Sequence, residues 1–216
     1  MNSPLNSQFN QFKKRTLDLI LGTFLLVLSL PLGIIIAFLI KLSSQGPVLF
    51  LRKDHGELVK RVGKDGKLFV FPKFRSMQAQ TDSLRFSPKF QQKNSRPGPL
   101  TKFPNDPRIN RVGKFLRKFS LDELPQLWCV VCGTMSLVGP RPHLPEEVAK
   151  YSPKAKAVLQ VKPGLTGLPA ISGRSELGFE REIELDLEYL KNWTLTLDLK
   201  ILWKTIFVVL FPKHRE

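Results

Sequence analysis

Cysteine is scarce in this chain of 216 residues, which contains only Cys129 and Cys132. Two cysteines cannot build the disulfide framework of a small secreted domain, so we infer a reducing compartment. Their spacing, Cys-x-x-Cys, also occurs in metal and redox sites. Such a site needs further ligands or a thioredoxin-like context, and only His143 lies nearby in the sequence. We therefore interpret both cysteines as small apolar positions on a helix.

Acidic residues are also few: 18 Asp and Glu stand against 34 Lys and Arg, giving a formal net charge of +16. This excess predicts a polyanionic partner, which could be nucleic acid, an anionic membrane surface or a phosphorylated small molecule. The sequence contains no recognised nucleic-acid-binding motif and no array of basic and aromatic residues, which argues against nucleic acid. A basic, membrane-anchored binding module remains an alternative that the charge alone allows. The length favours one domain.

One long apolar run, residues 17–40, contains Asp18 as its only charged residue. It is long enough to cross a bilayer, which takes about 20 apolar residues. It is also longer than the core of a signal peptide, about 7–15 residues, and no small-residue cleavage site follows it. We therefore expect the segment to be retained.

Two topologies for this run remain open, a plain span and a re-entrant helix. Cations flank both ends, which favours the cytoplasm for both flanks. Pro31 lies in the middle of the run, and a proline removes a helical hydrogen bond and bends the helix. The Ser29 hydroxyl would satisfy the carbonyl that the proline frees. A helix that enters the bilayer, breaks at Pro31 and returns fits both observations.

The remaining sequence predicts short strands, loops and helices. A strand is expected at residues 47–52 and a hairpin at residues 61–71, where Asp65-Gly66 lies in the turn. A proline-rich polar loop is expected at about 81–107. Helices are expected at 110–119, after Ser120, at 146–159, at 180–191 and at 195–211. The last carries large apolar residues and suits either a membrane interface or an ordinary core.

Residues 120–128 hold the adjacent carboxylates Asp122 and Glu123, and several cations precede them between Arg108 and Lys118. Such a pattern suits a site for a phosphate, a metal ion or both. Ser120 followed three residues later by Glu123 also matches a capping box, so the segment could simply begin a helix. Both interpretations remain open from these residues alone.

The chain resembles the small monotopic polyprenyl-phosphate phosphoglycosyl transferases, also called bacterial sugar transferases, over roughly residues 13–211. The central stretch, Ser120-Leu121-Asp122-Glu123-Leu124-Pro125-Gln126-Leu127-Trp128, carries the most specific match. The other matching motifs are residues 14–18, Pro31, and residues 46–48, 61–69, 73–77, 105–118, 135–142, 162–167, 173–174 and 198–201.

The resemblance implies an enzyme that starts the synthesis of a surface polysaccharide or glycoconjugate. Asp122 would be a nucleophile that attacks the sugar-bearing phosphate of a UDP-sugar, releases UMP and passes the sugar phosphate to polyprenyl (undecaprenyl) phosphate. A Mg²⁺ cofactor, held by Glu123 and Asp122, would offset the charge of the diphosphate. The residues that the resemblance assigns to phosphate or substrate binding are Arg75, Arg117, Arg141, Pro142 and Arg174.

The resemblance also implies a fold and a location. The fold class is α/β and mainly α, in which residues 1–42 form a re-entrant membrane helix with a basic flank, broken at Ser29 and Pro31. Residues 43–216 would form a compact, largely helical catalytic domain with a small β-hairpin and interfacial amphipathic helices. This domain would lie on the cytoplasmic face of the bacterial inner membrane, with both termini cytoplasmic. The expected partners are a UDP-sugar, polyprenyl phosphate and the bilayer, with a homodimer as a further option and no nucleic acid.

Two segments depart from the family pattern. Thr134 stands where the family often has Asp, and residues 168–172 replace the usual Trp-Ala-Gln-Val-Asn. The second segment lies in a region that the resemblance links to donor recognition. These changes keep an inactive homologue as an alternative, and the sequence does not name the sugar.

Overall fold

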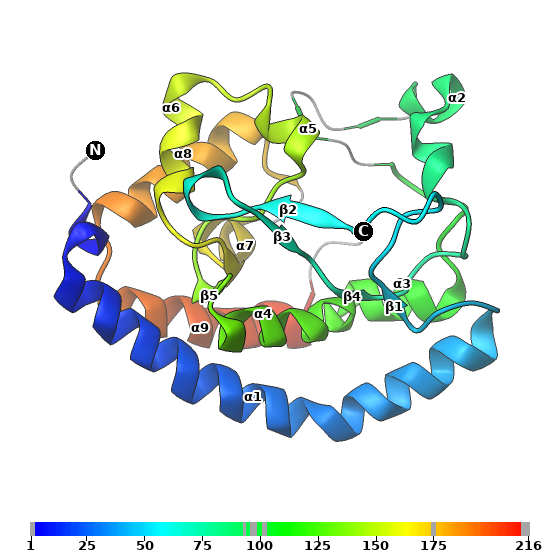
Figure 1. The fold of residues 1–216 in the computed structure, drawn as a ribbon, viewed down its shortest axis with the longest axis horizontal. Coiled ribbons are helices and arrows are strands. Elements are labelled where there is room, and N and C mark those ends of the chain that lie inside the picture. The colour runs from blue at the N-terminus through cyan, green and yellow to red at the C-terminus, as the bar shows by residue number, and fades with distance from the viewer. Residues whose placement is uncertain (1–2, 93, 96–98, 101–102, 174–175, 213–216) are drawn as a thin grey trace.

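The computed structural model describes residues 3–92, 94–95, 99–100, 103–173 and 176–212, and within them the chain is mainly helical (Figure 1). The α-helices are α1 (Gln8–Ser43), α2 (Pro88–Gln91), α3 (Arg111–Lys118), α4 (Leu127–Cys132), α5 (Pro145–Val148), α6 (Pro153–Lys156), α7 (Leu168–Ser172), α8 (Phe179–Lys191) and α9 (Leu195–Leu210). The 3-10 helices are η1 (Pro4–Asn6), η2 (Lys64–Gly66), η3 (Asp82–Phe86), η4 (Leu121–Gln126) and η5 (Ala157–Gln160).

The strands described in the structure form two-stranded sheets. β1 (Leu49–Phe50) pairs antiparallel with β4 (Lys73–Phe74), and β2 (Lys60–Val62) pairs antiparallel with β3 (Leu68–Val70). β5 (Ser136–Val138) runs parallel to β6 (Gly164–Thr166). The expected hairpin is therefore confirmed, whereas the expected strand at 47–52 is reduced to two residues.

Helix α1 is the element that sets the shape of the molecule. It is long and apolar enough, by length and composition, to cross a membrane. It is continuous, with Pro31 inside it, and Figure 1 shows that it bends midway, bowing away from the rest of the protein. The bend agrees with a proline that cannot donate to the fourth residue before it. The Ser29 hydroxyl donates to the Leu26 carbonyl at 2.8 Å and not to that of Val27, which the proline frees. The prediction that Ser29 satisfies the freed carbonyl is thus wrong, because its acceptor is the preceding carbonyl, that of Leu26.

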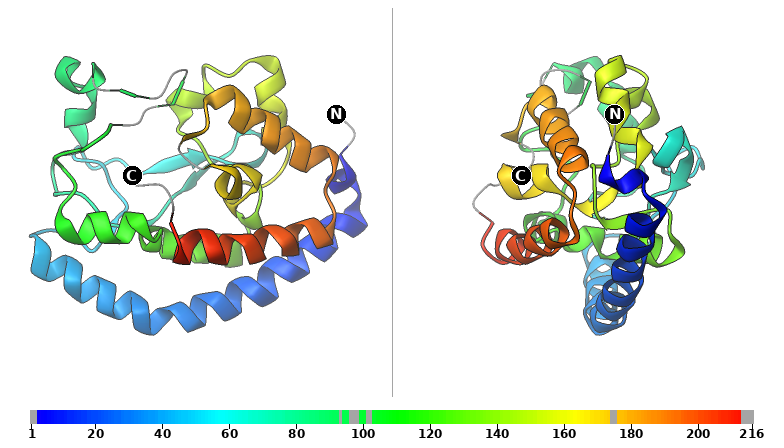
Figure 2. Two further views of the ribbon diagram at one scale, coloured as in Figure 1. Left: turned by 180° about the vertical axis from the view of Figure 1, so that it is seen from behind. Right: turned by 90° about the vertical axis from the view of Figure 1, so that its left-hand side faces the viewer.

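The remaining elements lie in layers on the concave side of α1. Figures 1 and 2 show α3, η4 and α4 in a row next to α1, with α9 alongside. The small sheets lie above this row, and α5, α6 and α8 lie on the side farthest from α1. The main core lies between these layers and includes Leu127, Val130, Leu137, Tyr189 and Ile201.

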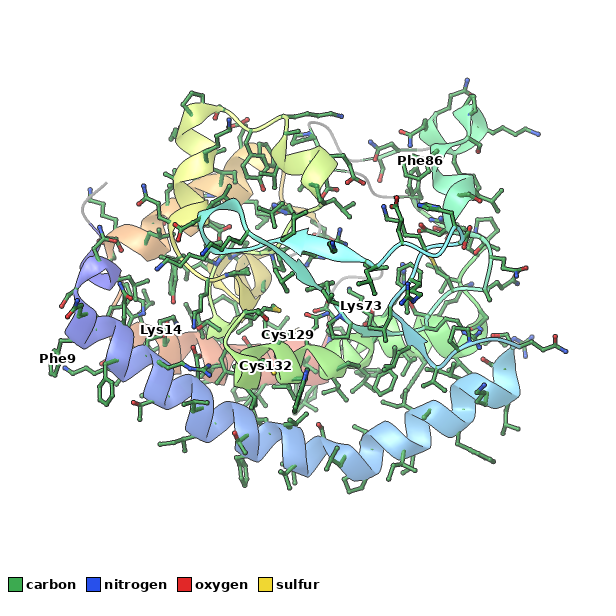
Figure 3. All side chains as sticks on the ribbon, viewed as in Figure 1. Phe9, Lys14, Lys73, Phe86, Cys129 and Cys132 are labelled. Carbon is green, nitrogen blue, oxygen red and sulfur yellow. The ribbon has the colours of Figure 1, made fainter. Side chains whose placement is uncertain are left out.

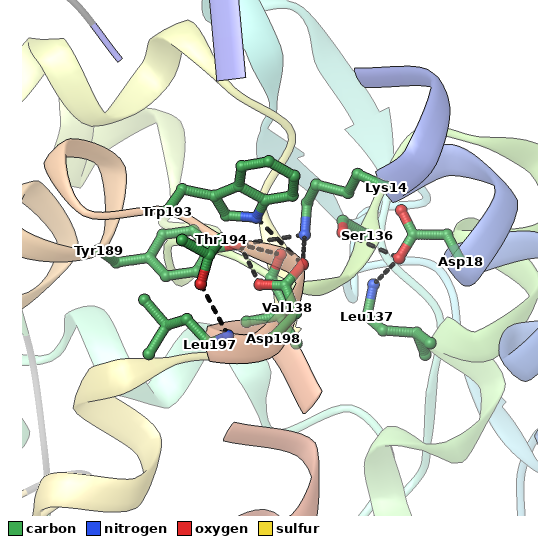
Figure 4. A network of polar contacts seen from close by, with 10 residues as sticks. All are labelled: Lys14, Asp18, Ser136, Leu137, Val138, Tyr189, Trp193, Thr194, Leu197 and Asp198. Carbon is green, nitrogen blue, oxygen red and sulfur yellow. Dashed lines mark hydrogen bonds and ion pairs between the residues drawn. The ribbon is translucent and has the colours of Figure 1, made fainter. Parts of the chain in front are cut away.

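A buried carboxylate on α9 joins three elements (Figure 4). Asp198 is fully buried and forms an ion pair with Lys14 of α1, whose Nζ lies 2.6 Å from Asp198 Oδ2. The Tyr189 hydroxyl of α8 donates to the same carboxylate at 2.8 Å, and the Trp193 indole N–H donates at 3.1 Å. Because a buried charge is costly unless paired and hydrogen-bonded, these contacts hold α1, α8 and α9 in one arrangement.

Two further side chains attach α1 to the core. The Asp18 carboxylate accepts from the backbone N–H of Leu137 at 2.8 Å and from the Ser136 hydroxyl at 3.0 Å (Figure 4). Arg15 donates to two carbonyls near the end of α4, at 2.6 and 2.7 Å. A cation at the C-terminus of a helix also complements the helix dipole. Polar residues in the first half of α1 therefore attach this helix to the rest of the protein.

Several predicted helices agree with the structure and one does not. Helices α3, α8 and α9 confirm the predictions for 110–119, 180–191 and 195–211. The expected helix at 146–159 is wrong: it is divided into α5, α6 and η5, because Pro153 disfavours a helical conformation at Ser152. Cys129 and Cys132 lie on α4 as expected (Figure 3), but only Cys129 is buried like an apolar position, whereas Cys132 is exposed.

Candidate active site

A large cleft of about 1490 Å³ opens on the concave side of α1. One part is polar and contains the two carboxylates Asp122 and Glu123 together with cations. Another part is apolar and lies between side chains of α1 and α9. The residues that line this apolar part are Leu21, Phe24, Leu25, Leu28, Leu32, Leu202, Ile206, Val209 and Leu210. The same cleft therefore presents both charged groups and apolar side chains to a ligand.

The carboxylate pair lies on η4, immediately after α3. Ser120, which lies between α3 and η4, adopts a left-handed backbone conformation with a φ of 54°, and its side chain does not cap η4. The predicted capping box is therefore wrong, because α3 ends in a turn that places Ser120 outside the extended conformation a cap needs. Asp122 is only 5% exposed, whereas Glu123 is half-buried.

Lys73 forms ion pairs with both carboxylates. Its Nζ lies 2.7 Å from Glu123 Oε1 and 3.7 Å from Asp122 Oδ2, and Figure 3 shows it near the centre of the molecule. Successive strand residues point to opposite faces, so Phe74 enters a core cluster with Leu116 while Lys73 faces the cleft. The sequence analysis did not assign Lys73 to the site.

Arg117 reaches the cleft from the last turn of α3. The Asn110 side chain caps this helix by accepting from Gly113 N–H at 2.7 Å. Gly113 packs directly on the Ser76 backbone, and a Cβ there would lie 1.9 Å from the Ser76 carbonyl oxygen. The Ser76 hydroxyl accepts from Arg117 Nε at 2.9 Å. This close packing fixes the Arg117 guanidinium at the cleft wall, where its remaining N–H groups suit a phosphate.

Arg75 also lines the cleft, but its guanidinium is directed toward the end of α1. It donates to the carbonyls of Gln45 at 2.6 Å and Ser44 at 2.8 Å. Burial lowers the pKa of the guanidinium from its usual value. These bonds use N–H groups of the guanidinium. Phosphate binding by Arg75 stays a prediction.

Arg141 and Pro142 lie in the turn after β5 and both line the cleft, Arg141 exposed and Pro142 buried. Behind them, His143 Nε2 lies 3.0 Å from Glu182 Oε1 on α8. Burial and the neighbouring Glu182 raise the pKa of Asp186 well above its ordinary value, and Arg141 acts in the opposite direction. Arg174, the remaining predicted phosphate ligand, lies outside the described residues.

The two departures from the family pattern occupy different places. The Thr134 hydroxyl donates to the Cys129 carbonyl at 3.2 Å, and Thr134 is not among the residues lining the cleft. Residues 168–172 form α7, whose Pro169 and Ala170 do line the cleft. A change in α7 therefore alters the cleft wall directly, whereas Thr134 acts on the end of α4.

Apolar side chains are widely exposed on α1 and α9. On α9 only Asp198 and Ile201 are buried, and the exposed rings of Trp203 and Phe207 meet edge to face with centroids 5.2 Å apart. Of the two alternatives for this segment, the exposed apolar side chains favour a helix at a membrane interface, although Ile201 packs into the main core. On α1 the exposed apolar side chains include Phe24, Val27, Leu28, Leu30, Ile34, Ile35 and Phe38. An exposed apolar surface of this extent is typical of contact with a membrane or a partner.

The side chains for a metal ion are few. Among the described residues, no group of three or more His, Cys, Asp and Glu side chains could hold a metal ion. Mg²⁺ is usually bound by one or two carboxylates together with water and substrate phosphates. The adjacent Asp122 and Glu123 fit this second kind of site, since they already share one cation, the Lys73 ammonium.

Comparison with known proteins gives consistent results. A sequence profile described as bacterial sugar transferase matches residues 9–212. The "UDP-galactose-lipid carrier transferase" of Erwinia amylovora is 40% identical over 215 residues, which are 97% of this chain and 43% of that protein. The "UDP-glucose:undecaprenyl-phosphate glucose-1-phosphate transferase" of Escherichia coli K12 is 38% identical over 214 residues, 95% of this chain and 42% of that protein.

A third relative is closer in length. The "Exopolysaccharide production protein ExoY" of Rhizobium meliloti is 38% identical over 198 residues, 89% of this chain and 83% of that protein. The chain thus spans less than half the length of the first two relatives and most of the third. The family profile spans the central motif and all the residues that line the cleft.

Proposed function

Because this chain belongs to the bacterial sugar transferase family, we propose that it transfers a sugar phosphate from a UDP-sugar to a polyprenyl phosphate and releases UMP. The observation that carries this proposal is the cleft, in which the carboxylate pair on η4 faces Lys73 and opens toward an apolar groove between α1 and α9. The polar part suits a nucleotide diphosphate sugar, and the apolar part suits a prenyl chain. Undecaprenyl phosphate, the lipid in the name of the E. coli relative, is the expected acceptor.

Asp122 is the proposed nucleophile. Its carboxylate oxygen forms a bond to the phosphorus that carries the sugar, and the bond from this phosphorus to the bridging oxygen breaks as UMP leaves. An oxygen of the polyprenyl phosphate then attacks the same phosphorus and releases Asp122 as a carboxylate. Asp122 is buried and stands beside a cation, so it is held in place for attack with little surrounding water.

The neighbouring charges have separate tasks. A carboxylate and a diphosphate repel each other, so the site must offset negative charge before the bond can form. The Lys73 ammonium pairs with both carboxylates, and the Arg117 guanidinium lines the cleft wall. Glu123, together with Asp122, would hold Mg²⁺, which when bound supplies further positive charge at the phosphate oxygens. Arg75, Arg141 and Pro142 complete the proposed substrate wall.

The same geometry supports a proposed location. We place the bend of α1 in the cytoplasmic leaflet of the bacterial inner membrane, with both ends of the helix and the catalytic domain on the cytoplasmic side. The exposed apolar side chains of α1 and α9 would contact lipid, and the net charge of +16 would be drawn to anionic headgroups. The cleft would then lie at headgroup depth, where a lipid-borne phosphate is found.

Replacing the nucleophile tests the proposal. Asp122→Asn removes the attacking charge with little change in shape, so UMP release from UDP-sugars and the phosphosugar adduct seen by intact-protein mass spectrometry should both fall to background. Membrane association should be unchanged. Asp82→Asn is the matched control, because Asp82 lines the same cleft away from the pair, and it should retain activity.

The outcomes separate the alternatives. Full activity of Asp122→Asn would contradict the mechanism. An unmodified protein that releases no UMP from any UDP-sugar in a panel would instead favour an inactive homologue, the alternative raised by residues 168–172. UDP-glucose and UDP-galactose belong in that panel, because the relatives' names contain both sugars.

A further inference from the structure

Gln126 is a buried polar residue of the cleft that the mechanism above does not use. It is 1% exposed, and with Asp122 it is one of the two buried residues of η4. It also lines the cleft. Its side-chain nitrogen, Nε2, is buried and has no hydrogen-bond partner among the residues that the structure describes.

A buried N–H group without an acceptor is uncommon and destabilises a protein. The great majority of buried polar side-chain atoms have at least one partner, and a donor left unpaired loses its hydration without compensation. An apolar side chain of the same size would avoid this cost. The amide is therefore unfavourable for the free protein, and a ligand that accepts its hydrogen bond would reverse the balance.

The position of Gln126 indicates which ligand group that is. A 3-10 helix has about three residues per turn, so Gln126 lies one turn after Glu123 on the same side of η4. The terminal torsion of a glutamine is broad, so the amide can turn toward this side without strain. The charged groups on this stretch of the cleft wall are the carboxylates of Asp122 and Glu123, which belong to the same 3-10 helix as Gln126, and the Lys73 ammonium that pairs with them. The acceptor that a ligand brings closest to Asp122 is an oxygen of the phosphoryl group.

We propose that Gln126 is a catalytic residue whose Nε2 donates a hydrogen bond to a phosphoryl oxygen of the sugar phosphate while it is transferred to and from Asp122. The inference rests on the proposed function. A neutral amide stabilises charge that develops on this oxygen without forming an ion pair with Asp122, as a further cation would. Lys73 and Gln126 thus act on different partners, Lys73 on the carboxylates and Gln126 on the phosphoryl group.

The variant Gln126→Met tests this inference, because methionine is unbranched, of similar size and has no N–H donor. We expect the rate of adduct formation to fall by about 100-fold, the effect of removing one such donor. The melting temperature of the free protein should stay the same or rise, since the unpaired donor is gone. Gln78→Met is the matched control: Gln78 lines the same cleft but is exposed, and its rate should not change.

Gln126→Glu is a second variant, which keeps the shape of the side chain and removes both N–H groups, so the inference stays testable if the methionine variant fails to fold. Adduct formation at the normal rate by either folded variant would overturn the inference. A loss of similar size with UDP-glucose and UDP-galactose supports a phosphoryl contact, and a loss confined to one sugar overturns it. Failure of the unmodified protein to form any adduct would overturn the proposed function itself.

Discussion

At the scale of single residues, two carboxylates of the site share one cation. The carboxylates of Asp122 and Glu123 lie near each other, since both contact the same lysine ammonium. The Lys73 ammonium lies 2.7 Å from one and 3.7 Å from the other and lowers the repulsion between them. The three residues form one electrostatic unit, in which changing the cation alters the nucleophile.

Lys73→Met tests this unit at the scale of one residue. Without the ammonium, the two carboxylates face each other and an incoming diphosphate meets more negative charge, so we expect adduct formation to fall by about 100-fold or more. Single-turnover kinetics with intact-protein mass spectrometry would measure this step. The control Lys53→Met removes a cleft lysine that pairs with Glu57 instead, and it should keep nearly the full rate. An unimpaired Lys73→Met enzyme would show that the ammonium is dispensable.

Sequence reasoning found the carboxylate pair and missed its cation for a physical reason. Asp122 and Glu123 lie in one motif, whereas Lys73 is 50 residues from Glu123 and reaches it through tertiary packing of β4 on η4. Arg75 follows the same pattern, since its donation to the end of α1 depends on a contact between distant segments. The alternation of Lys73 and Phe74 on a strand was the one available signal, and β4 is too short to be recognised from its own sequence.

At the scale of elements, local patterns predicted those helices whose stability comes from a regular apolar face. Helices α8 and α9 were predicted nearly to the residue for this reason. The capping box at Ser120 failed because the left-handed turn after α3 determines its backbone, and a sequence pattern cannot show that turn. The bend of α1 was predicted from Pro31, but its hydrogen bonding was not.

The bend of α1 leads to a prediction about both ends of this helix. Single cysteines in place of Gln11 and Gln45, each in a variant with Cys129 and Cys132 replaced by alanine, should both react with a membrane-impermeant thiol reagent only after the cytoplasmic side is opened. Glu180→Cys on α8 is the reference for the side of the catalytic domain. Labelling of positions 11 and 45 from opposite sides would instead show that α1 spans the bilayer.

The whole molecule combines a strong positive charge with buried acids. Although the net charge is +16, the carboxylates of Asp186 and Glu182 lie next to each other inside α8. Burial, followed by the charge of Glu182, raises the pKa of Asp186 well above its ordinary value. The folded state therefore holds a proton that the unfolded chain releases above about pH 4. Stability is fully present below that pH and falls as pH rises toward the folded-state pKa.

Asp186→Asn should flatten this dependence. The amide keeps the shape but cannot ionise, so the melting temperature should decline less from pH 5 upward than in the unmodified protein, and it should be higher at pH 8. Thermal unfolding in one detergent across pH 5–8 would measure the difference. Glu184→Gln, on the exposed side of α8, should leave the profile unchanged. Parallel profiles for Asp186→Asn and the unmodified protein would contradict the assignment.

The polar contacts of α1 have a practical consequence for anyone who wishes to shorten this protein into a soluble fragment. Lys14 neutralises the fully buried Asp198, and Arg15 binds the end of α4. Deleting α1 would leave that carboxylate buried without its cation, a loss of about 3–5 kcal/mol, which is a large part of the stability of most domains. Fragments that begin after residue 43 should therefore misfold or aggregate, and a soluble form is better sought by replacing exposed apolar residues of α1 while keeping its polar ones.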